Sequence, residues 1–198
     1  LIPTGLKALP SILRSLVIYG PNAGGKSNLV TALAFVRALV ADSATTIKPG
    51  QTLNVQPFKL DRKLVDDPSE FELTFLDNNV RYQYGFKLTA NRIIEEWLLV
   101  YKTHKPQHWF TRYFDEKTHE YKFEFGSSLT GQKKQWQDAT RPNALFLSTA
   151  AQWNSEQLEP IFEYITKKLI VITSTSGIGI DFSTSLLQDQ IWKKSICK

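Results

Sequence analysis

The chain has 198 residues, 42% hydrophobic and 22% charged, which is ordinary for a globular domain, and no apolar run is long enough to cross a bilayer. A single cysteine, Cys197, excludes an internal disulfide, and the start of the chain lacks a signal-peptide layout, so we expect a cytoplasmic protein with no membrane contact. The net charge of +5 permits contact with nucleic acid without requiring it.

The most informative pattern lies in residues 16–27, where an apolar run precedes the motif G-x-x-x-x-G-K-S. Val17 and Ile18 are β-branched and are bounded by Gly-Pro, which predicts a buried strand. Residues 28–41 have apolar side chains at helical spacing. These side chains are Leu29, Leu33, Val36 and Val40. The order strand, glycine-rich loop, helix is the context of a nucleoside triphosphatase phosphate loop.

Each residue type in this loop has a chemical reason. Gly20, Gly24 and Gly25 let the backbone curl so that successive N–H groups point at phosphate oxygens. The helix that follows adds its positive N-terminal end. Lys26 places a charge at the β and γ phosphates, and the Ser27 hydroxyl is a ligand for Mg²⁺. We therefore expect ATP and Mg²⁺ as cofactors.

From residue 58 to residue 126 the pattern changes to alternation of apolar and polar residues, which is typical of half-buried strands. Short polar turns separate the runs. The pattern predicts an antiparallel meander of about five strands, over residues 71–76, 80–88, 93–102, 109–114 and 121–125.

After the meander, residues 127–198 are expected to begin with a loop, to form a helix over 156–168 and to include a short strand over 169–172. We accordingly divide the chain into 1–57, 58–126 and 127–198. No apolar run ends in Asp or Asp-Glu, so the acidic residues that would support Mg²⁺ and activate water are expected outside this chain. The lack of any Met, even at position 1, suggests a fragment.

The meander also holds aromatic residues interleaved with cations such as Lys102, Lys105 and Arg112. One interpretation is a nucleic-acid platform, and the other, which we favour, is a sheet with one buried aromatic face. Three histidines in this region are expected to be exposed in loops rather than to bind metal. The aromatic residues are Trp97, Tyr101, Trp109, Phe110, Tyr113 and Phe114, and the histidines are His104, His108 and His119.

Residues 18–29 resemble the G-P-N-x-x-G-K-S-N loop of ABC-type and SMC-like ATPases. The Pro21-Asn22 pair and Asn28 distinguish this loop from the loops of small GTPases and nucleoside kinases. More narrowly, the chain looks like the SMC-like, OLD-related ATP-binding proteins of bacterial anti-phage defence loci. Residues 33–40 and 145–150 carry this further likeness. The resemblance covers roughly residues 15–170 and implies an α/β P-loop NTPase of ABC/SMC-like type with an inserted antiparallel β-meander.

The resemblance also implies a role for particular residues. Members of the family dimerise head to tail with ATP between the protomers, and ATP would here contact Gly20, Pro21, Asn22, Ala23, Gly24, Gly25, Lys26, Ser27 and Asn28. Gln152, or in its place Gln56, could be the glutamine that contacts Mg²⁺ and the attacking water. The signature motif, the acidic strand end and the switch histidine are not recognisable.

The resemblance favours an ATPase that hydrolyses ATP as a dimer and controls a partner effector, a nuclease or a toxin, in phage defence. Three alternatives stay open: a non-hydrolysing nucleotide-binding scaffold, an SMC-like ATPase of the DNA-repair type, and a different P-loop enzyme such as a kinase or GTPase. The last lacks support, because the chain has neither an N-K-x-D motif nor an arginine-rich lid.

Overall fold

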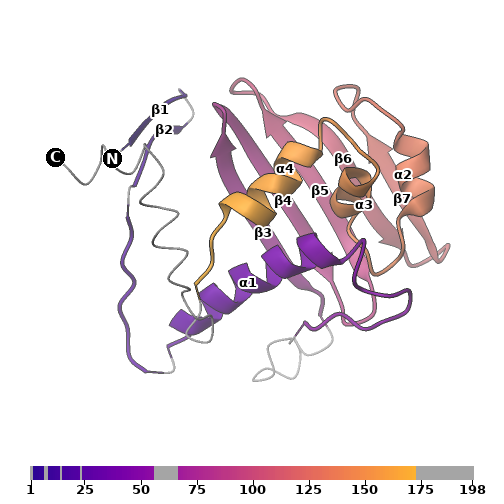
Figure 1. The fold of residues 1–198 in the computed structure, drawn as a ribbon, viewed down its shortest axis with the longest axis horizontal. Coiled ribbons are helices and arrows are strands. Elements are labelled where there is room, and N and C mark those ends of the chain that lie inside the picture. The colour runs from indigo at the N-terminus through magenta and orange to yellow at the C-terminus, as the bar shows by residue number, and fades with distance from the viewer. Residues whose placement is uncertain (1, 7–8, 14, 23, 56–66, 173–198) are drawn as a thin grey trace.

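The computed structural model describes residues 2–6, 9–13, 15–22, 24–55 and 67–172 (Figure 1). Two strands form a small hairpin, and five further strands form an antiparallel sheet in chain order. The strands are β1 (Ile2–Leu6), β2 (Leu9–Ile12), β3 (Ser69–Asp77), β4 (Val80–Leu88), β5 (Ile93–Tyr101), β6 (Gln107–Asp115) and β7 (Glu120–Phe125). The helices are α1 (Lys26–Asp42), α2 (Lys133–Ala139), α3 (Phe146–Gln152), α4 (Glu159–Glu163) and the π-helix η1 (Tyr164–Lys168).

The predicted five-stranded meander is confirmed, and each predicted strand overlaps one of β3 to β7. The β3–β4 hairpin closes with a two-residue loop, because Asp77 pairs with Val80. Asn78 and Asn79 between them have φ angles of 49° and 62°, which an asparagine tolerates and which match the twist of the two strands. The turn that the sequence indicated is therefore the feature that fixes the register of β3 on β4.

Helices α1, α3 and α4 lie over one face of this sheet, as Figure 1 shows. Alternation along each strand sends one set of apolar side chains towards the helices, and the resulting core joins the sheet to α1, α3 and the α4–η1 segment. Fully buried members include Val40, Phe86, Leu98, Phe110, Phe146, Leu147, Ile161 and Ile165. This single core contains residues from all three predicted divisions, and the boundaries 1–57, 58–126 and 127–198 stay a prediction.

Phe146, the first residue of α3, stands at the centre of the core. Its ring centroid lies 4.8 Å from that of Phe110, and both rings of the Phe123 and Phe125 pair on β7 lie 5.6 Å away. Edge-on and tilted contacts of this kind add to the free energy gained by burial. The sheet thus has a buried aromatic face that packs against α3. Of the six aromatic residues predicted from the sequence, only Trp109 and Phe110 are buried, and the other four are half-buried.

A buried ion pair lies beside this aromatic group. Glu96 on β5 accepts hydrogen bonds from the backbone N–H groups of Phe146 (2.6 Å) and Leu147 (2.9 Å), which are unpaired donors at the start of α3. The Arg112 guanidinium on β6 lies 3.8 Å from the same carboxylate and donates to the carbonyl oxygens of Ala144 and Arg141. Glu96 and Arg112 therefore fix α3 to the sheet.

Burial has opposite effects on the two members of this pair. It raises the pKa of Glu96, against the pull of Arg112 and of the backbone N–H donors. It lowers the pKa of Arg112, against the attraction of Glu96. Taking both charges out of water is costly. Hydrogen bonds from Tyr84 and the α3 backbone to Glu96, and from Arg112 to the 141–144 turn, offset this cost, although Arg112 Nε has no hydrogen-bond partner within the described chain.

The helix predicted over 28–41 is confirmed, but three predictions about local structure are wrong. Residues 16–19 and residues 169–172 are not strands, and no described strand pairs with either segment. An apolar run becomes a strand only when a neighbour satisfies its backbone, and the described chain supplies none. The loop predicted after residue 126 contains α2, which has a single buried apolar residue, Trp136, and so no helical apolar pattern.

Within the described ranges, no helix is both long enough and apolar enough to cross a bilayer.

Candidate functional site

The start of α1 is an anion-binding end that no side chain of the helix occupies. Gly25 stands at the N-cap with φ 79° and ψ 3°, a left-handed conformation that a side chain would strain. The cap makes no side-chain hydrogen bond, and the first turn has no acidic residue. The first N–H groups of the helix and the positive end of its dipole are thus available to an external anion.

The loop in front of the helix closes on itself. The Gly24 N–H donates to the Pro21 carbonyl oxygen at 3.1 Å, and a Cβ at Gly24 would lie 3.0 Å from that oxygen. This close approach disfavours a side chain at position 24, and the positive φ favours glycine at position 25. At Gly20 an added Cβ would meet only Lys26 Cδ, at 3.9 Å, so the described loop gives no steric reason for that glycine.

Lys26 is the first residue of α1, and its side chain turns back over the loop. Its Nζ donates to the carbonyl oxygens of Gly20 (2.8 Å) and Pro21 (2.6 Å). These are neutral acceptors, and a phosphate oxygen is a stronger, charge-assisted partner for an ammonium group. The lysine is therefore held at the mouth of the loop and can exchange these carbonyls for phosphate.

The loop and the first turn of α1 enclose a cavity of ≈ 260 Å³. It is lined by Asn22, Gly24, Gly25, Lys26, Ser27 and Asn28. The predicted phosphate-binding residues thus come together in space, apart from Ala23, which lies outside the described residues. Gly20 and Pro21 join the site through the Lys26 ammonium.

The loop residues fit a phosphate chain with a bound divalent cation, but they supply few cation ligands. The Ser27 side chain is exposed and makes no hydrogen bond within the described chain. No group of three or more His, Cys, Asp or Glu residues that could hold a metal ion occurs among the described residues. A hydroxyl alone leaves most of the octahedral shell of Mg²⁺ to phosphate oxygens and water.

The structure places one of the two predicted glutamines. Gln56 lies outside the described residues, whereas Gln152 is the last residue of α3 and is exposed. Helix α3 packs against the other end of α1, where the Ser148 hydroxyl donates to the Val40 carbonyl oxygen and Leu145 N–H to Ser43 Oγ. A 17-residue helix is about 25 Å long, so this structure does not bring Gln152 to the phosphate loop. Its role stays a prediction.

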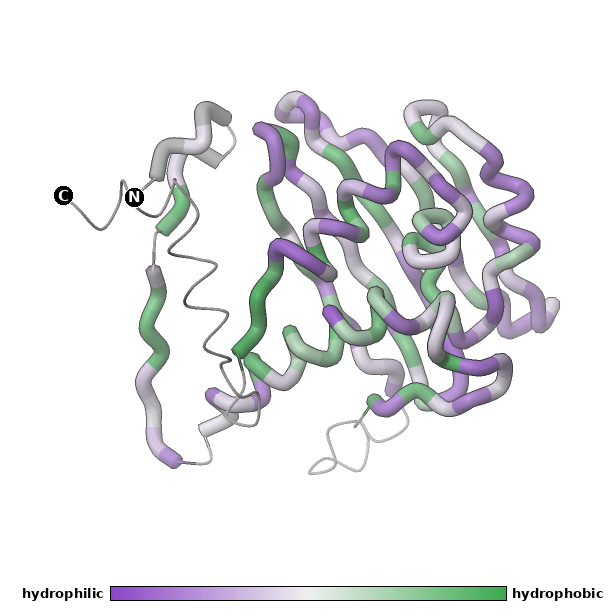
Figure 2. The backbone as a smooth tube through the Cα atoms, viewed as in Figure 1, coloured by the Kyte–Doolittle hydropathy of each residue, from purple (hydrophilic) through white to green (hydrophobic). Residues whose placement is uncertain are grey.

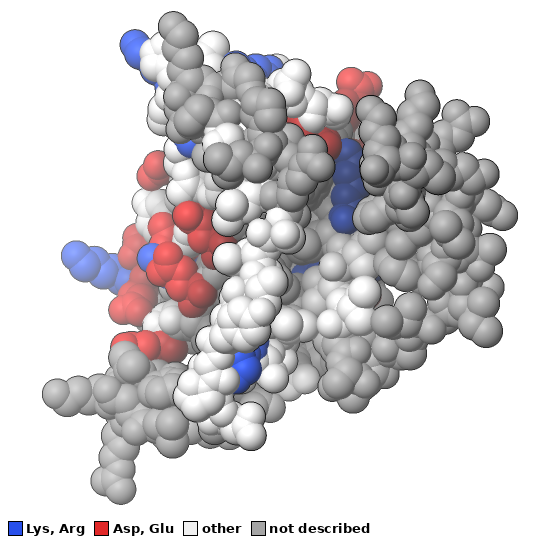
Figure 3. Space-filling model, turned by 90° about the vertical axis from the view of Figure 1, so that its left-hand side faces the viewer, with Lys and Arg blue, Asp and Glu red and all other residues white. Residues whose placement is uncertain are grey.

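The proposed nucleic-acid platform needs correction at one residue. Arg112 is fully buried and bound to Glu96 and to backbone carbonyls, so it cannot contact a phosphate backbone. Trp109 and Phe110 are buried as well, whereas Lys102 and Lys105 are exposed. On the side that carries β1 and β2, Figure 3 shows Asp and Glu side chains gathered in one group, which would repel nucleic acid there.

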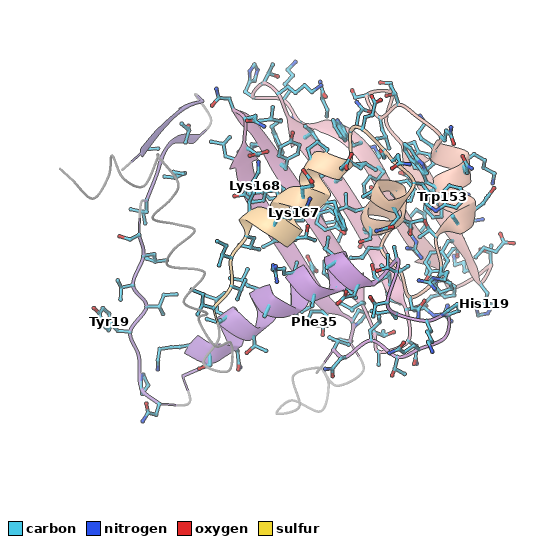
Figure 4. The ribbon with its side chains drawn as sticks, in the orientation of Figure 1. Tyr19, Phe35, His119, Trp153, Lys167 and Lys168 are labelled. Atoms are coloured by element: carbon cyan, nitrogen blue, oxygen red, sulfur yellow. The ribbon has the colours of Figure 1, made fainter. Side chains whose placement is uncertain are left out.

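The histidines differ from one another. His104 and His119 are exposed in turns, as predicted, and Figure 4 shows His119 at the far end of the molecule from Tyr19. His108 is instead half-buried on β6, where its Nε2 lies 2.8 Å from Thr111 Oγ1. None of the three belongs to a metal-binding group within the described ranges.

Sequence reasoning missed Glu96, although one signal was present. Glu96 stands in the same phase of β5 as Leu98 and Val100, which face the core. A charged residue in the apolar phase of a strand indicates a buried partner. Arg112 is the residue opposite Glu96 on β6.

Comparison with known proteins adds one match. Residues 15–168 match the model of a family described as "AAA domain, putative AbiEii toxin, Type IV TA system". Neither the curated proteins nor the solved structures searched contain a match. The matched range begins just before the first apolar run and ends at the last residue of η1.

Proposed function

Because this chain belongs to that family of AAA domains, which are ATP-binding P-loop ATPases, we propose that its loop over residues 20–28 holds the phosphates of ATP with Mg²⁺. The observation that carries the proposal is the start of α1. There an N-terminal helix end with no capping side chain lies directly behind an ammonium group bound only to carbonyl oxygens. Both features favour an anion, and the cavity between them has no acidic lining residue.

In this proposal each residue has one task. Backbone N–H groups from Gly25 to Ser27 donate to phosphate oxygens, and the Lys26 ammonium leaves the loop carbonyls to bind the outer phosphates. The Ser27 hydroxyl offers one oxygen to Mg²⁺, which supplies charge neutralisation when bound. The base and ribose would need contacts from elsewhere, since the described residues that line the cavity all belong to the loop and the first turn of α1.

We further propose that a complete assembly, in which two copies share the nucleotide, hydrolyses ATP and controls an effector protein. The toxin named in the family description supports an effector of the toxin class, and a nuclease is the other candidate that the resemblance implies. A role in anti-phage defence rests on that resemblance alone. Most of the described loop residues are exposed, which leaves room for a second copy across the phosphates.

A second function is favoured by a separate observation. No acidic residue is among the described residues that line the cavity, and no group of three or more potential metal ligands occurs in the described ranges. A chain of this kind could bind ATP without hydrolysing it and serve as a nucleotide-dependent scaffold. We expect the purified 198-residue chain to show negligible ATP turnover in a phosphate-release assay. Steady turnover that Ser27→Ala abolishes would mean that the chain holds its own catalytic carboxylate.

The binding proposal is tested with Lys26→Ala and isothermal titration calorimetry using ATP and Mg²⁺. Removing a charged hydrogen-bond donor costs about 1.5–3 kcal/mol, so we expect ATP to bind at least about tenfold more weakly. The matched control is Lys48→Ala, because Lys48 is also a lysine near α1 but its side chain is exposed and makes no hydrogen bond within the described chain.

Circular dichroism must show that both variants keep the wild-type fold. Equal ATP affinity for wild type and a folded Lys26→Ala variant would refute the site. Equal loss in both lysine variants would show that the effect is one of net charge and not of the loop.

A further inference from the structure

One face of the five-stranded sheet packs against the helices, and the other, which we call the outer face, carries aromatic side chains that are not buried. Alternate residues of each strand point to the two faces, and Figure 2 shows hydrophobic and hydrophilic stretches that follow one another along the strands. The outward-pointing residues are half-buried or exposed, apart from Gly85. The centre of the outer face holds Trp97, Leu99, Tyr101 and Tyr113.

The Trp97 ring on β5 is held in one orientation by its neighbours. Gly85 is the residue opposite it on β4, and a Cβ added there would lie 2.3 Å from Trp97 Cζ2. The ring therefore lies against the β4 backbone at a position where any other residue would displace it. The Trp97 Nε1 group donates to Glu72 Oε2 on β3 at 3.1 Å, which fixes the ring further.

Glu72 is an exposed carboxylate that its neighbours hold through one of its two oxygens. Oε2 accepts from Trp97 and also from Gln83 Nε2, at 3.0 Å. The Gln83 side chain is itself fixed, because its Oε1 accepts from the Tyr101 hydroxyl at 2.9 Å. Within the described chain Glu72 Oε1 makes no hydrogen bond and Glu72 forms no ion pair. The network thus presents a fixed carboxylate oxygen, with no cation bound to it, beside a fixed indole ring.

The charge of the outer face is opposite in sign to that of the whole chain, which is +5. Its acidic residues include Glu70, Glu72, Glu95, Glu120 and Glu124. Its basic residues are Arg81, Lys87 and Lys122, and Lys87 is paired with Glu95 at 2.9 Å and with Glu70 at 3.7 Å. Figure 3 shows Asp and Glu side chains gathered in one group on the side of the molecule where β3 forms the edge of the sheet. A face of this kind attracts a cationic partner and repels an anionic one.

We propose that the outer face binds an arginine-rich segment of a partner protein. A guanidinium group donates to a carboxylate and stacks on an aromatic ring, so Glu72 and Trp97 together match arginine better than lysine. The chain makes one such contact within itself, because Arg81 Cζ lies 3.7 Å from the centroid of the Tyr101 ring. An aromatic centre with a charged rim is also the usual composition of a protein interface.

This surface is separate from the phosphate loop, because the loop leads into α1, which lies on the opposite face of the sheet (Figure 1). Binding at the outer face needs no nucleotide and so goes beyond the function proposed above.

The test uses a fluorescein-labelled nine-residue peptide in which arginine alternates with threonine. Fluorescence anisotropy measures its binding to the full 198-residue chain at about 0.1 M salt, without nucleotide. Two further peptides replace every arginine with lysine or with citrulline, which has nearly the shape of arginine but no charge. We expect the arginine peptide to bind more tightly than the lysine peptide, and the citrulline peptide not to bind.

Glu72→Gln and Trp97→Leu should each weaken binding of the arginine peptide about threefold, because each removes one partially exposed contact with a guanidinium group. The matched control is Glu156→Gln, because Glu156 is also exposed but lies in the turn before α4. The control should bind the arginine peptide as the wild type does. Circular dichroism must show that all three variants keep the wild-type fold.

Equal weakening by Glu72→Gln and Glu156→Gln would show an effect of net charge and overturn the proposal. No binding of the arginine peptide to the folded wild type would overturn it as well, and equal binding of the lysine peptide would overturn the assignment to arginine. Self-association in sedimentation velocity that Trp97→Leu abolishes would make a second copy the occupant instead. Since nucleotide is absent throughout, none of these failures affects the Lys26→Ala result.

Discussion

The β-sheet region and the phosphate-loop region of this chain have similar apolar runs, but those of the sheet are buried and the run ahead of the loop is exposed. Val100 on β5 is fully buried, because β4, β6 and the helices surround it. Val17 ahead of the phosphate loop is 66% exposed, because no described strand lies beside it. The difference teaches that an apolar run with strand-like composition forms a buried strand only where neighbouring strands or helices pack against it. The phosphate site needs little of this packing, since its donors are backbone groups and one lysine.

The largest loss of unfolding free energy is expected from Arg112→Ala, which removes one member of the buried ion pair in the β-sheet region. The change leaves the Glu96 carboxylate buried without its cation, and removing one partner of a buried pair costs about 3–5 kcal/mol. Urea unfolding followed by circular dichroism measures the loss. Arg81→Ala is the matched control, because Arg81 lies only partly buried over the Tyr101 ring and should cost no more than about 1 kcal/mol.

If Arg112→Ala and Arg81→Ala cost the same, the buried pair does not hold α3 on the sheet. ATP affinity of Arg112→Ala should stay close to wild type while the protein is folded, because the pair lies far from the loop at the opposite end of α1.

A smaller difference in unfolding free energy is expected between alanine variants of Val100 and Val17. Val100→Ala should cost about 2 kcal/mol of unfolding free energy, from lost burial and a cavity. Val17→Ala should change the unfolding free energy by no more than about 0.5 kcal/mol, because Val17 is exposed. Chemical denaturation of both variants in one buffer gives the comparison.

A double-mutant cycle sharpens this result. The effects of Val17→Ala and Val100→Ala on the unfolding free energy should add, because those residues share no partner. Non-additivity would show that the two regions are coupled.

Much of the sheet could be predicted because its determinants are local. Alternation placed all five strands, and the Asn78-Asn79 turn set the first register. The phosphate loop could also be predicted, because Gly24 and Gly25 act through their own backbone and Lys26 is adjacent in sequence. Helix α2 escaped prediction because one tryptophan, Trp136, anchors it, and periodicity cannot be read from one residue.

The sequence by itself thus determined the phosphate loop, the helix behind it and the five-stranded meander, since each depends on residues within a few positions of one another. Tertiary structure alone decided that Arg112 is a buried partner of Glu96 and not a surface cation, because the two residues meet only across β5 and β6. It also decided that Gln152 lies at the far end of α1 and that Val17 is uncovered. Burial depends on which residues pack around a side chain, and residues distant along the chain cannot be predicted from a local sequence pattern.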